Sequence, residues 1–263
     1  MADRNTFRLM LLILGLIFAF LYLPISVLVG LSFNEGGLPT AWTGFSVKWY
    51  GELLANKDIL RAAGNTLIVA VFSTLLSTIL GSLLAVGVEI RRRNGKWLET
   101  MIFAPMIIPD IVLAIALLSF FSLLGVKMGL HTIIVSHVVF NLAFVSAVVR
   151  ARLKSFDWSI VEASNDLGAT TATTMRRVVL PVLMPAILAG ALLAFTLSVD
   201  EFIIAFFTAG AGRSSITLPM QIFSMIRFGV TPEINALATV VMAVSVVALA
   251  LSQRLNRGGL PGQ

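Results

Sequence analysis

Residues Glu162–Pro181 read EASNDLGATTATTMRRVVLP, and this polar, charged stretch lies between long apolar runs. Gly168 divides the stretch in two, and Pro181 opens the next apolar run. A short helical element that shows apolar residues to water is best explained by docking into a groove on a partner. What this stretch contacts is therefore the main question about function.

The composition around this stretch indicates an integral membrane protein. Of the 263 residues, 58% are hydrophobic and 12% are charged, and mean hydropathy is +0.96. A soluble domain carries about 25% charged residues. The absence of cysteine excludes disulfides and thiolate metal sites. The net charge of +6 reflects orientation in the bilayer and not nucleic-acid binding, because the basic residues cluster in particular loops.

Six apolar runs predict an all-α membrane protein with about six transmembrane helices in one domain, residues 1–263. Each run has roughly 18–26 residues, enough to cross ~30 Å of hydrocarbon. The first run is too long for a cleavable signal peptide, so we expect an uncleaved anchor. The predicted spans are residues 9–31, 64–88, 101–124, 131–149, 182–207 and 234–251.

Lysine and arginine predict the direction of insertion. Thirteen of the 19 basic residues fall before the first run, after the second, after the fourth and after the sixth. By the positive-inside rule, both termini and the segment 150–181 lie in the cytoplasm. Of the external segments, 42–60 has an interfacial composition and 218–228 is expected to form a short helix.

The second run carries small residues at every fourth position. Ser73, Ser77, Gly81 and Ala85 form this stripe. Small side chains let helix backbones approach closely in lipid, so the stripe predicts a seam between helices and not a substrate site.

The segment before Gly168 is typical of a short helix. Ser159 and Glu162 have the spacing of a capping box, and Gly168 is a helix stop. A second short helix is expected from Thr170 or Thr171 to about Val179. The first helix is too short to be stable alone, which favours docking into a partner. The alternative is a loop helix folded against the protein's own spans.

A family resemblance enters at this segment. The pattern Glu162-Ala163-Ser164, three residues, Gly168, nine residues, then Val178-x-Leu180-Pro181 resembles the EAA motif of ABC importer permeases. That motif reads Glu-Ala-Ala, three residues, Gly, nine residues, Ile-x-Leu-Pro. Ser164 and Val178 depart from it, each with a residue of similar size.

The resemblance covers nearly the whole chain. PMIIPDIVLAI (residues 105–115) and the region 198–239 are similar to the second permease subunit of spermidine/putrescine-type importers. It implies a type I importer (MetI-like) fold in a bacterial cytoplasmic (inner) membrane. It also implies a homologous second permease subunit, two copies of a cytoplasmic ATPase subunit and a periplasmic substrate-binding protein. The ATPase-coupling residues would be Ser159, Glu162, Ala163, Ser164, Leu167 and Gly168.

Three acids lie within the apolar runs. Asp110 follows Pro109 in the third run, and Asp200 and Glu201 lie in the fifth. A charge at a helix centre costs ~2.5–3.5 kcal/mol on insertion scales, so these acids are expected to face water or the bundle interior. We hypothesise that they line the path of a cationic substrate. The alternative is that Asp110 caps a helix break and that the other two sit in a wet outer vestibule.

The chain has no G-x-x-x-x-G-K-[ST] motif, so ATP and Mg²⁺ are expected on a partner ATPase and no cofactor on this chain. His131 and His137 are six residues apart, off the spacing of a metal pair. No nucleophile–base arrangement indicates an enzyme. The alternatives to a polyamine importer are a permease for another solute, such as an amino-acid-like compound or ferric iron, and a proton-coupled secondary transporter. A secondary transporter usually shows an internal repeat, which is not visible here.

Overall fold

The computed structural model describes residues 4–37, 41–90, 95–227, 229 and 231–257. Within these ranges the regular structure is helical, with one isolated bridge between Asn34 and Phe45. This confirms the all-α prediction. The chain divides into two compact units, Met1–Leu60 with Ile222–Gln263 (unit 1) and Arg61–Gln221 (unit 2). The prediction of a single transmembrane domain stays a prediction.

Unit 1 contains α1 (Arg4–Leu31), α2 (Lys48–Ala55) and α12 (Pro232–Arg257). The apolar stretch of α1, Thr6–Leu31, has a mean hydropathy of 2.7 and none of it is buried within the chain. Helix α2 packs on α12, where the Asn56 side chain donates to Glu233 at 3.1 Å. Since most of α1 is exposed within the chain and only its C-terminal end is half-buried, its apolar surface suits lipid or other subunits.

Unit 2 is built around α3 (Lys57–Ile90), α6 (Leu130–Leu153) and α9 (Leu180–Asp200). Helix α6 is the most enclosed of the long helices, with 56% of its apolar window buried. Its residues Val145, Val149 and Leu153 pack with Ala85 of α3 and Leu183 of α9. Burial of these side chains is what joins the three helices.

The stripe of small residues on α3 forms the predicted seam. The Gly81 carbonyl accepts a hydrogen bond from the Ser146 hydroxyl of α6 at 2.9 Å. A Cβ added at Gly81 would lie 2.9 Å from Cβ of Val145 and 3.0 Å from the carbonyl oxygen of Leu142. The two helix backbones therefore approach so closely that only glycine fits at this position.

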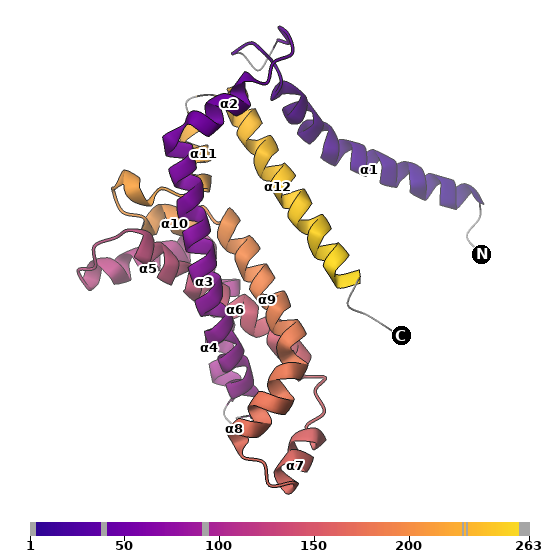
Figure 1. Ribbon diagram of the computed structural model, residues 1–263, viewed down its shortest axis with the longest axis vertical. Coiled ribbons are helices and arrows are strands. Elements are labelled where there is room, and N and C mark those ends of the chain that lie inside the picture. Colours follow the sequence, from indigo (N-terminus) through magenta and orange to yellow (C-terminus); the bar gives the residue numbers. More distant parts are fainter. Residues whose placement is uncertain (1–3, 38–40, 91–94, 228, 230, 258–263) are drawn as a thin grey trace. The chain divides into compact units, whose positions relative to one another are not determined.

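The predicted third span, 101–124, is made of two helices joined at a sharp bend, and its crossing of the membrane stays a prediction. Helix α4 (Gly95–Ile107) ends before Pro109, and α5 (Asp110–Leu123) begins after it. The two helices are bent by 114° (Figure 1). Pro109 has no N–H to donate and disfavours helical geometry at Ile108, so the helix ends there. Asp110 consequently lies in the first turn of a helix and not in the middle of a span.

The predicted fifth span, 182–207, differs at both ends. Helix α8 (Thr171–Thr174), a π-helical turn (Met175–Val179) and α9 form one continuous helix of 30 residues, Thr171–Asp200. The separate short helix predicted up to Val179 is therefore wrong. The wider turn places the Leu180 N–H on the Met175 carbonyl just before Pro181, which has no N–H. At its other end the helix stops at Asp200, and α10 (Ile203–Thr208) is a separate helix.

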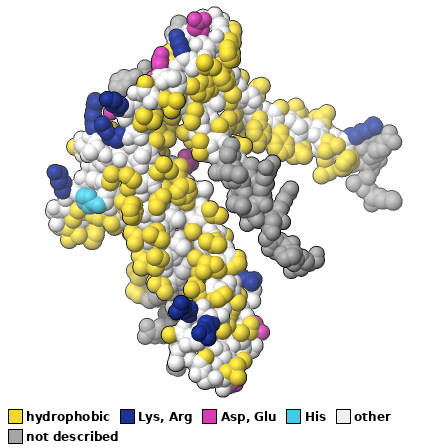
Figure 2. All heavy atoms as spheres, viewed as in Figure 1, with side chains coloured by type: hydrophobic (Ala, Val, Ile, Leu, Met, Phe, Trp, Pro, Cys, Tyr) yellow, Lys and Arg dark blue, Asp and Glu magenta, His cyan; other side chains and the backbone are white. Residues whose placement is uncertain are grey.

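Among the described residues, four helices are long and apolar enough to cross a membrane, and the number is five if the bent pair α4–α5 is one span. In α12 the described apolar part is shorter, Pro232–Val244, and side chains beyond residue 246 are not described. The short external helix predicted at 218–228 is present as α11 (Leu218–Arg227). In Figure 2 hydrophobic side chains cover most of the visible face of unit 2 between its two ends. Such a surface suits lipid or partner helices.

Candidate functional site

Helix α7 (Ser159–Asp166) is the helix expected to couple to an ATPase, and it begins differently from the prediction. The Ser159 N–H donates to the Asp157 carboxylate at 3.0 Å and not to the Glu162 side chain. Hydrogen bonds from the Ser159 side chain and backbone hold the pKa of Asp157 below its usual range. The capping-box assignment of Ser159 and Glu162 is therefore wrong, and Asp157 does the capping.

The predicted stop at Gly168 is confirmed. Gly168 has φ +79°, which is the left-handed region that side chains with a Cβ avoid. Its N–H donates to the Asn165 carbonyl, and the Ala169 N–H donates to the Ser164 carbonyl. This pair of bonds is a Schellman motif, which satisfies the free carbonyls at the end of α7.

One face of α7 is anchored on unit 2. Val161 and Trp158 pack against the cluster that contains Val149 and Leu183. The Ser164 hydroxyl shares a hydrogen bond of 2.9 Å with the Thr174 hydroxyl. Ser164, where the EAA motif has alanine, thus adds a polar link to the continuous helix that begins at Thr171. Figure 1 shows α7 beside α8 at one end of unit 2.

A second face of α7 is exposed, and we call it the coupling face. It carries three apolar residues at i, i+3 and i+7, namely Ile160, Ala163 and Leu167. Leu167 is 89% exposed. Glu162 is exposed beside them in the first turn of the helix. One face of α7 packs against the protein's own spans, as one of the two interpretations of the sequence expected. Another face leaves an apolar stripe uncovered, as the interpretation of docking into a partner requires.

The three membrane acids do not share one environment. Asp110 and Asp200 are exposed, and no hydrogen bond or ion pair joins either carboxylate to another residue in the described part of the chain. The elements that carry them meet, because Leu113 of α5, Leu197 of α9 and Ile204 of α10 belong to one apolar cluster. The structure thus brings the start of α5 and the end of α9 to the same apolar cluster.

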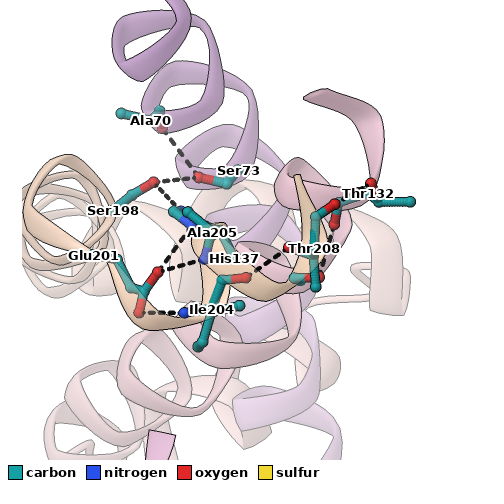
Figure 3. A network of polar contacts seen from close by, with 10 residues as sticks. Ala70, Ser73, Thr132, His137, Ser198, Glu201, Ile204, Ala205 and Thr208 are labelled. Carbon is teal, nitrogen blue, oxygen red and sulfur yellow. Dashed lines mark hydrogen bonds and ion pairs between the residues drawn. The ribbon is translucent and has the colours of Figure 1, made fainter. Parts of the chain in front are cut away.

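Glu201 differs from its neighbour Asp200. Its side chain is 7% exposed, and its two carboxylate oxygens accept the backbone N–H groups of Ile204 at 2.8 Å and Ala205 at 2.9 Å (Figure 3). Carboxylate Oε2 also lies 3.4 Å from Nε2 of His137. Glu201 therefore caps α10 from the break between α9 and α10.

Two residues that the sequence interpretation treated as packing or orientation residues take part in these contacts. His137 is buried at 1% exposure, between Ser198 and Glu201. Arg150, expected only to orient the chain, lies 3.8 Å from the Glu89 carboxylate and stacks over Phe103 of α4. An ionisable side chain inside an apolar run is itself a signal of function, but neither partner could be read from the sequence.

Comparison with known proteins gives a consistent picture. Residues 77–257 match the family described as binding-protein-dependent transport system inner membrane component. The spermidine/putrescine transport system permease protein PotC of Escherichia coli (strain K12) is 43% identical over 247 residues, 94% of this chain and 93% of its own. The putrescine transport system permease protein PotI of the same strain is 43% identical over 253 residues, 93% of this chain and 89% of its own.

Two solved structures share the fold. A bacterial ABC transporter that imports the acidic polysaccharide alginate has a chain with a TM-score of 0.78 at 17% identity, and the match covers 96% of this chain and 97% of that one. The MetNI methionine ABC transporter has a chain with a TM-score of 0.59 at 20% identity, and the match covers 81% of this chain and 98% of that one. At these identities the likeness concerns the fold alone.

Proposed function

We propose that this chain, which belongs to the family of inner membrane components of binding-protein-dependent transport systems, moves polyamines across the membrane. It is a multi-pass permease subunit of an ABC importer and not an enzyme, since a separate chain hydrolyses ATP. The observation that carries the polyamine substrate is the 43% identity, across nearly all of the chain, to permeases named for spermidine and putrescine. The family decides against a proton-coupled secondary transporter.

The chemistry of the membrane acids supports this substrate class. A polyamine is a flexible chain of ammonium groups, and a carboxylate in a low-dielectric path attracts a cation more strongly than one in water. Asp110 and Asp200 have exposed carboxylates with no partner among the described side chains, so they are free to meet a cation. Glu201, a third acid, follows Asp200 directly in the sequence. A neutral or anionic solute would gain nothing from this arrangement.

The coupling face supports the mode of energy supply. We infer that Ile160, Ala163 and Leu167 dock into a groove of a cytoplasmic ATPase subunit, next to the exposed Glu162. Because another face of α7 is packed on unit 2, a movement of the ATPase would pull directly on the helix Thr171–Asp200. That helix ends at Asp200, so the ATPase contact and the substrate path are joined by one rigid element.

The remaining parts of the assembly follow from this arrangement as inferences. Half a path needs a second, homologous permease subunit, and two coupling helices need two ATPase copies, which hold the ATP and Mg²⁺. A periplasmic binding protein delivers the substrate. In this orientation α7 and both termini face the cytoplasm of a bacterium, and this chain itself holds no cofactor.

Uptake of labelled spermidine and putrescine by the complete importer tests the proposal. We expect Asp110→Asn and Asp200→Asn to lower uptake at wild-type protein levels, because each removes an uncompensated carboxylate from the path. Glu52→Gln, which neutralises an exposed acid on α2, is the matched control and should transport normally. Unchanged uptake in both path variants would remove these acids from the path. A cognate binding protein that binds no polyamine in calorimetry would refute the substrate and leave the permease assignment standing.

A further inference from the structure

We propose that His137 is a positioning residue, which acts through Glu201 to fix the corner between α9 and α10 and so to hold Asp200 at the substrate path. This inference rests on the proposed function for the role of Asp200, but its geometry is independent of the substrate. The proposal assigns different roles to the adjacent acids Asp200 and Glu201. Asp200 faces the path, and Glu201 is the structural acid that keeps its neighbour in place.

At the corner between α9 and α10, Glu201 accepts hydrogen bonds from backbone N–H groups that have no acceptor in their own helix. Helix α9 ends at Asp200, Glu201 is extended with φ −70° and ψ 121°, and α10 begins at Ile203. The first N–H groups of a helix have no acceptor in the helix itself, and in an apolar setting each unmet group is costly. Glu201 accepts two of them, from Ile204 and Ala205, with one oxygen each (Figure 3). The position of its carboxylate therefore sets the direction in which α10 leaves α9.

His137 holds that carboxylate from the side of α6. Its Nδ1 lies 2.7 Å from the Ser198 hydroxyl, and its Nε2 lies 3.4 Å from Oε2 of Glu201. The second distance is long for a hydrogen bond but within ion-pair range, and Nε2 has no nearer polar partner in the described ranges. One imidazole thus connects the last turn of α9 with the residue that follows it.

A chain of buried hydroxyl groups holds the other ring nitrogen, Nδ1 of His137. Ser198 is 3.0 Å from the Ser73 hydroxyl of α3, which can donate to the Ala70 carbonyl at 3.3 Å. Each serine hydroxyl can donate or accept, so Nδ1 of His137 can accept from Ser198 or donate to it. An ionised carboxylate only accepts. Nε2 faces this acceptor, Oε2 of Glu201, at 3.4 Å, so the imidazole lies within ion-pair range of the carboxylate.

The network ties three long helices to the corner. Ser73 belongs to α3, His137 to α6 and Ser198 to α9, and all three side chains are buried. Five consecutive contacts run from the α3 backbone to the α10 backbone through these side chains and Glu201 (Figure 3). A corner held in this way cannot turn without breaking a buried polar contact, which makes it rigid at the point where Asp200 is exposed.

Two conservative substitutions separate positioning from packing. The amide of a glutamine at position 137 reaches as far as Nε2 of histidine, so His137→Gln keeps a donor for Glu201. The amide of an asparagine reaches only as far as Nδ1, so His137→Asn keeps the Ser198 contact and loses the Glu201 contact. Both variants retain a neutral polar side chain and differ by one methylene, so the free energy of unfolding is measured for each, to separate a packing effect from a loss of position.

Thiol labelling at the corner measures the position without reference to substrate. The chain has no cysteine, so Asp200→Cys introduces the only thiol in this subunit. In the assembled importer we expect a cationic methanethiosulfonate reagent to label it, followed by mass spectrometry of this chain. The labelling rate should change several-fold when His137→Asn is added and stay at its original value with His137→Gln. Thr196→Cys, one turn earlier on α9 and also exposed, is the control and should label equally in all backgrounds.

Uptake gives the second measurement, with position 200 left as aspartate. We expect His137→Asn to lower polyamine uptake by about tenfold at equal protein levels, the usual effect of losing a residue that orients a functional one. His137→Gln should restore most of it. The loss should vanish when His137→Asn is placed in a Glu201→Gln background, because the histidine acts through that carboxylate.

The outcomes are decisive in both directions. Equal labelling of Asp200→Cys in the two His137 variants, or no labelling of it in the otherwise unchanged chain, would overturn the positioning role. Equal loss of folding in both variants would do the same, since it indicates packing. If labelling behaves as expected while the unaltered importer takes up no polyamine, the substrate assignment fails and the positioning role of His137 stands.

Discussion

The close approach of α3 and α6 predicts the cost of a single methyl group at Gly81. In Gly81→Ala the new Cβ would lie 2.9 Å from Cβ of Val145 and 3.0 Å from the Leu142 carbonyl oxygen. Neither neighbour can move aside, because one is backbone and the other is the branch point of a stiff side chain. The helices must separate instead, which also strains the hydrogen bond from Ser146 to the Gly81 carbonyl. Overpacking of this kind costs about 1–3 kcal/mol.

Gly87→Ala is the matched control for this prediction. Gly87 lies on the same helix, and a Cβ added there meets nothing within 4 Å. Both substitutions gain the same ~0.5–1 kcal/mol of helix stability from replacing glycine, so their difference isolates the contact. We expect Gly81→Ala to unfold with a free energy about 1–3 kcal/mol lower than that of Gly87→Ala, measured by SDS unfolding of the purified chain in mixed micelles. Equal free energies of unfolding would refute the close approach of the two helices.

Three further predictions concern the end of unit 2 that carries α7. Leu167→Asp should abolish co-purification with the ATPase subunit, because it places a charge on the coupling face. It should leave the free energy of unfolding within ~0.5 kcal/mol of wild type, because it touches no packed residue. Retained co-purification would contradict the docking. The folded state lowers the pKa of Asp157, so its cap on α7 is complete above the ordinary pKa of an aspartate, about 3.9. The cap is lost as the pH falls through the lower pKa that Asp157 has in the folded state. Amide exchange at Ser159, corrected for its intrinsic pH dependence, should show this loss, and Asp157→Asn should remove it. Glu89→Gln should lower the free energy of unfolding by ~2–3 kcal/mol, because it removes the carboxylate that faces Arg150. This is less than for a fully buried pair, since Arg150 is 14% exposed. Adding Arg150→Leu should restore part of the lost free energy.

Apolar length predicts which parts of this chain are helices better than where the helices break. The first, second and fourth predicted spans lie inside single helices, because a long run without charges has no other stable structure in lipid. The break at Pro109 was visible as a proline, but the 114° bend was not. Hydropathy averages over a bend, and one missing N–H does not say how far the next helix turns away.

At the start of α7, a residue outside the predicted capping motif accepts the hydrogen bond that the motif would have made. Ser159 and Glu162 have the right types and spacing for a capping box, yet the Ser159 N–H is bonded to Asp157. Both candidate acceptors, Asp157 and Glu162, are carboxylates, so acceptor strength does not decide between them. Asp157 lies two residues before Ser159, and its short side chain reaches that N–H within a local turn. The end of the helix was predictable, because a backbone conformation open mainly to glycine admits few competitors.

Asp200 and Glu201 mark the limit of what a sequence can say about a membrane site. By type, spacing and surroundings the two acids are equivalent, since both are carboxylates in one apolar run. The helix break makes them different, because it directs one side chain to the surface and the other to two free backbone N–H groups and His137, 64 positions earlier. Hydropathy therefore identifies where an ionisable residue costs free energy, and only the tertiary contacts identify what compensates that cost. In this chain the compensated acid belongs to the framework, and the uncompensated one is the acid that we propose for a cation.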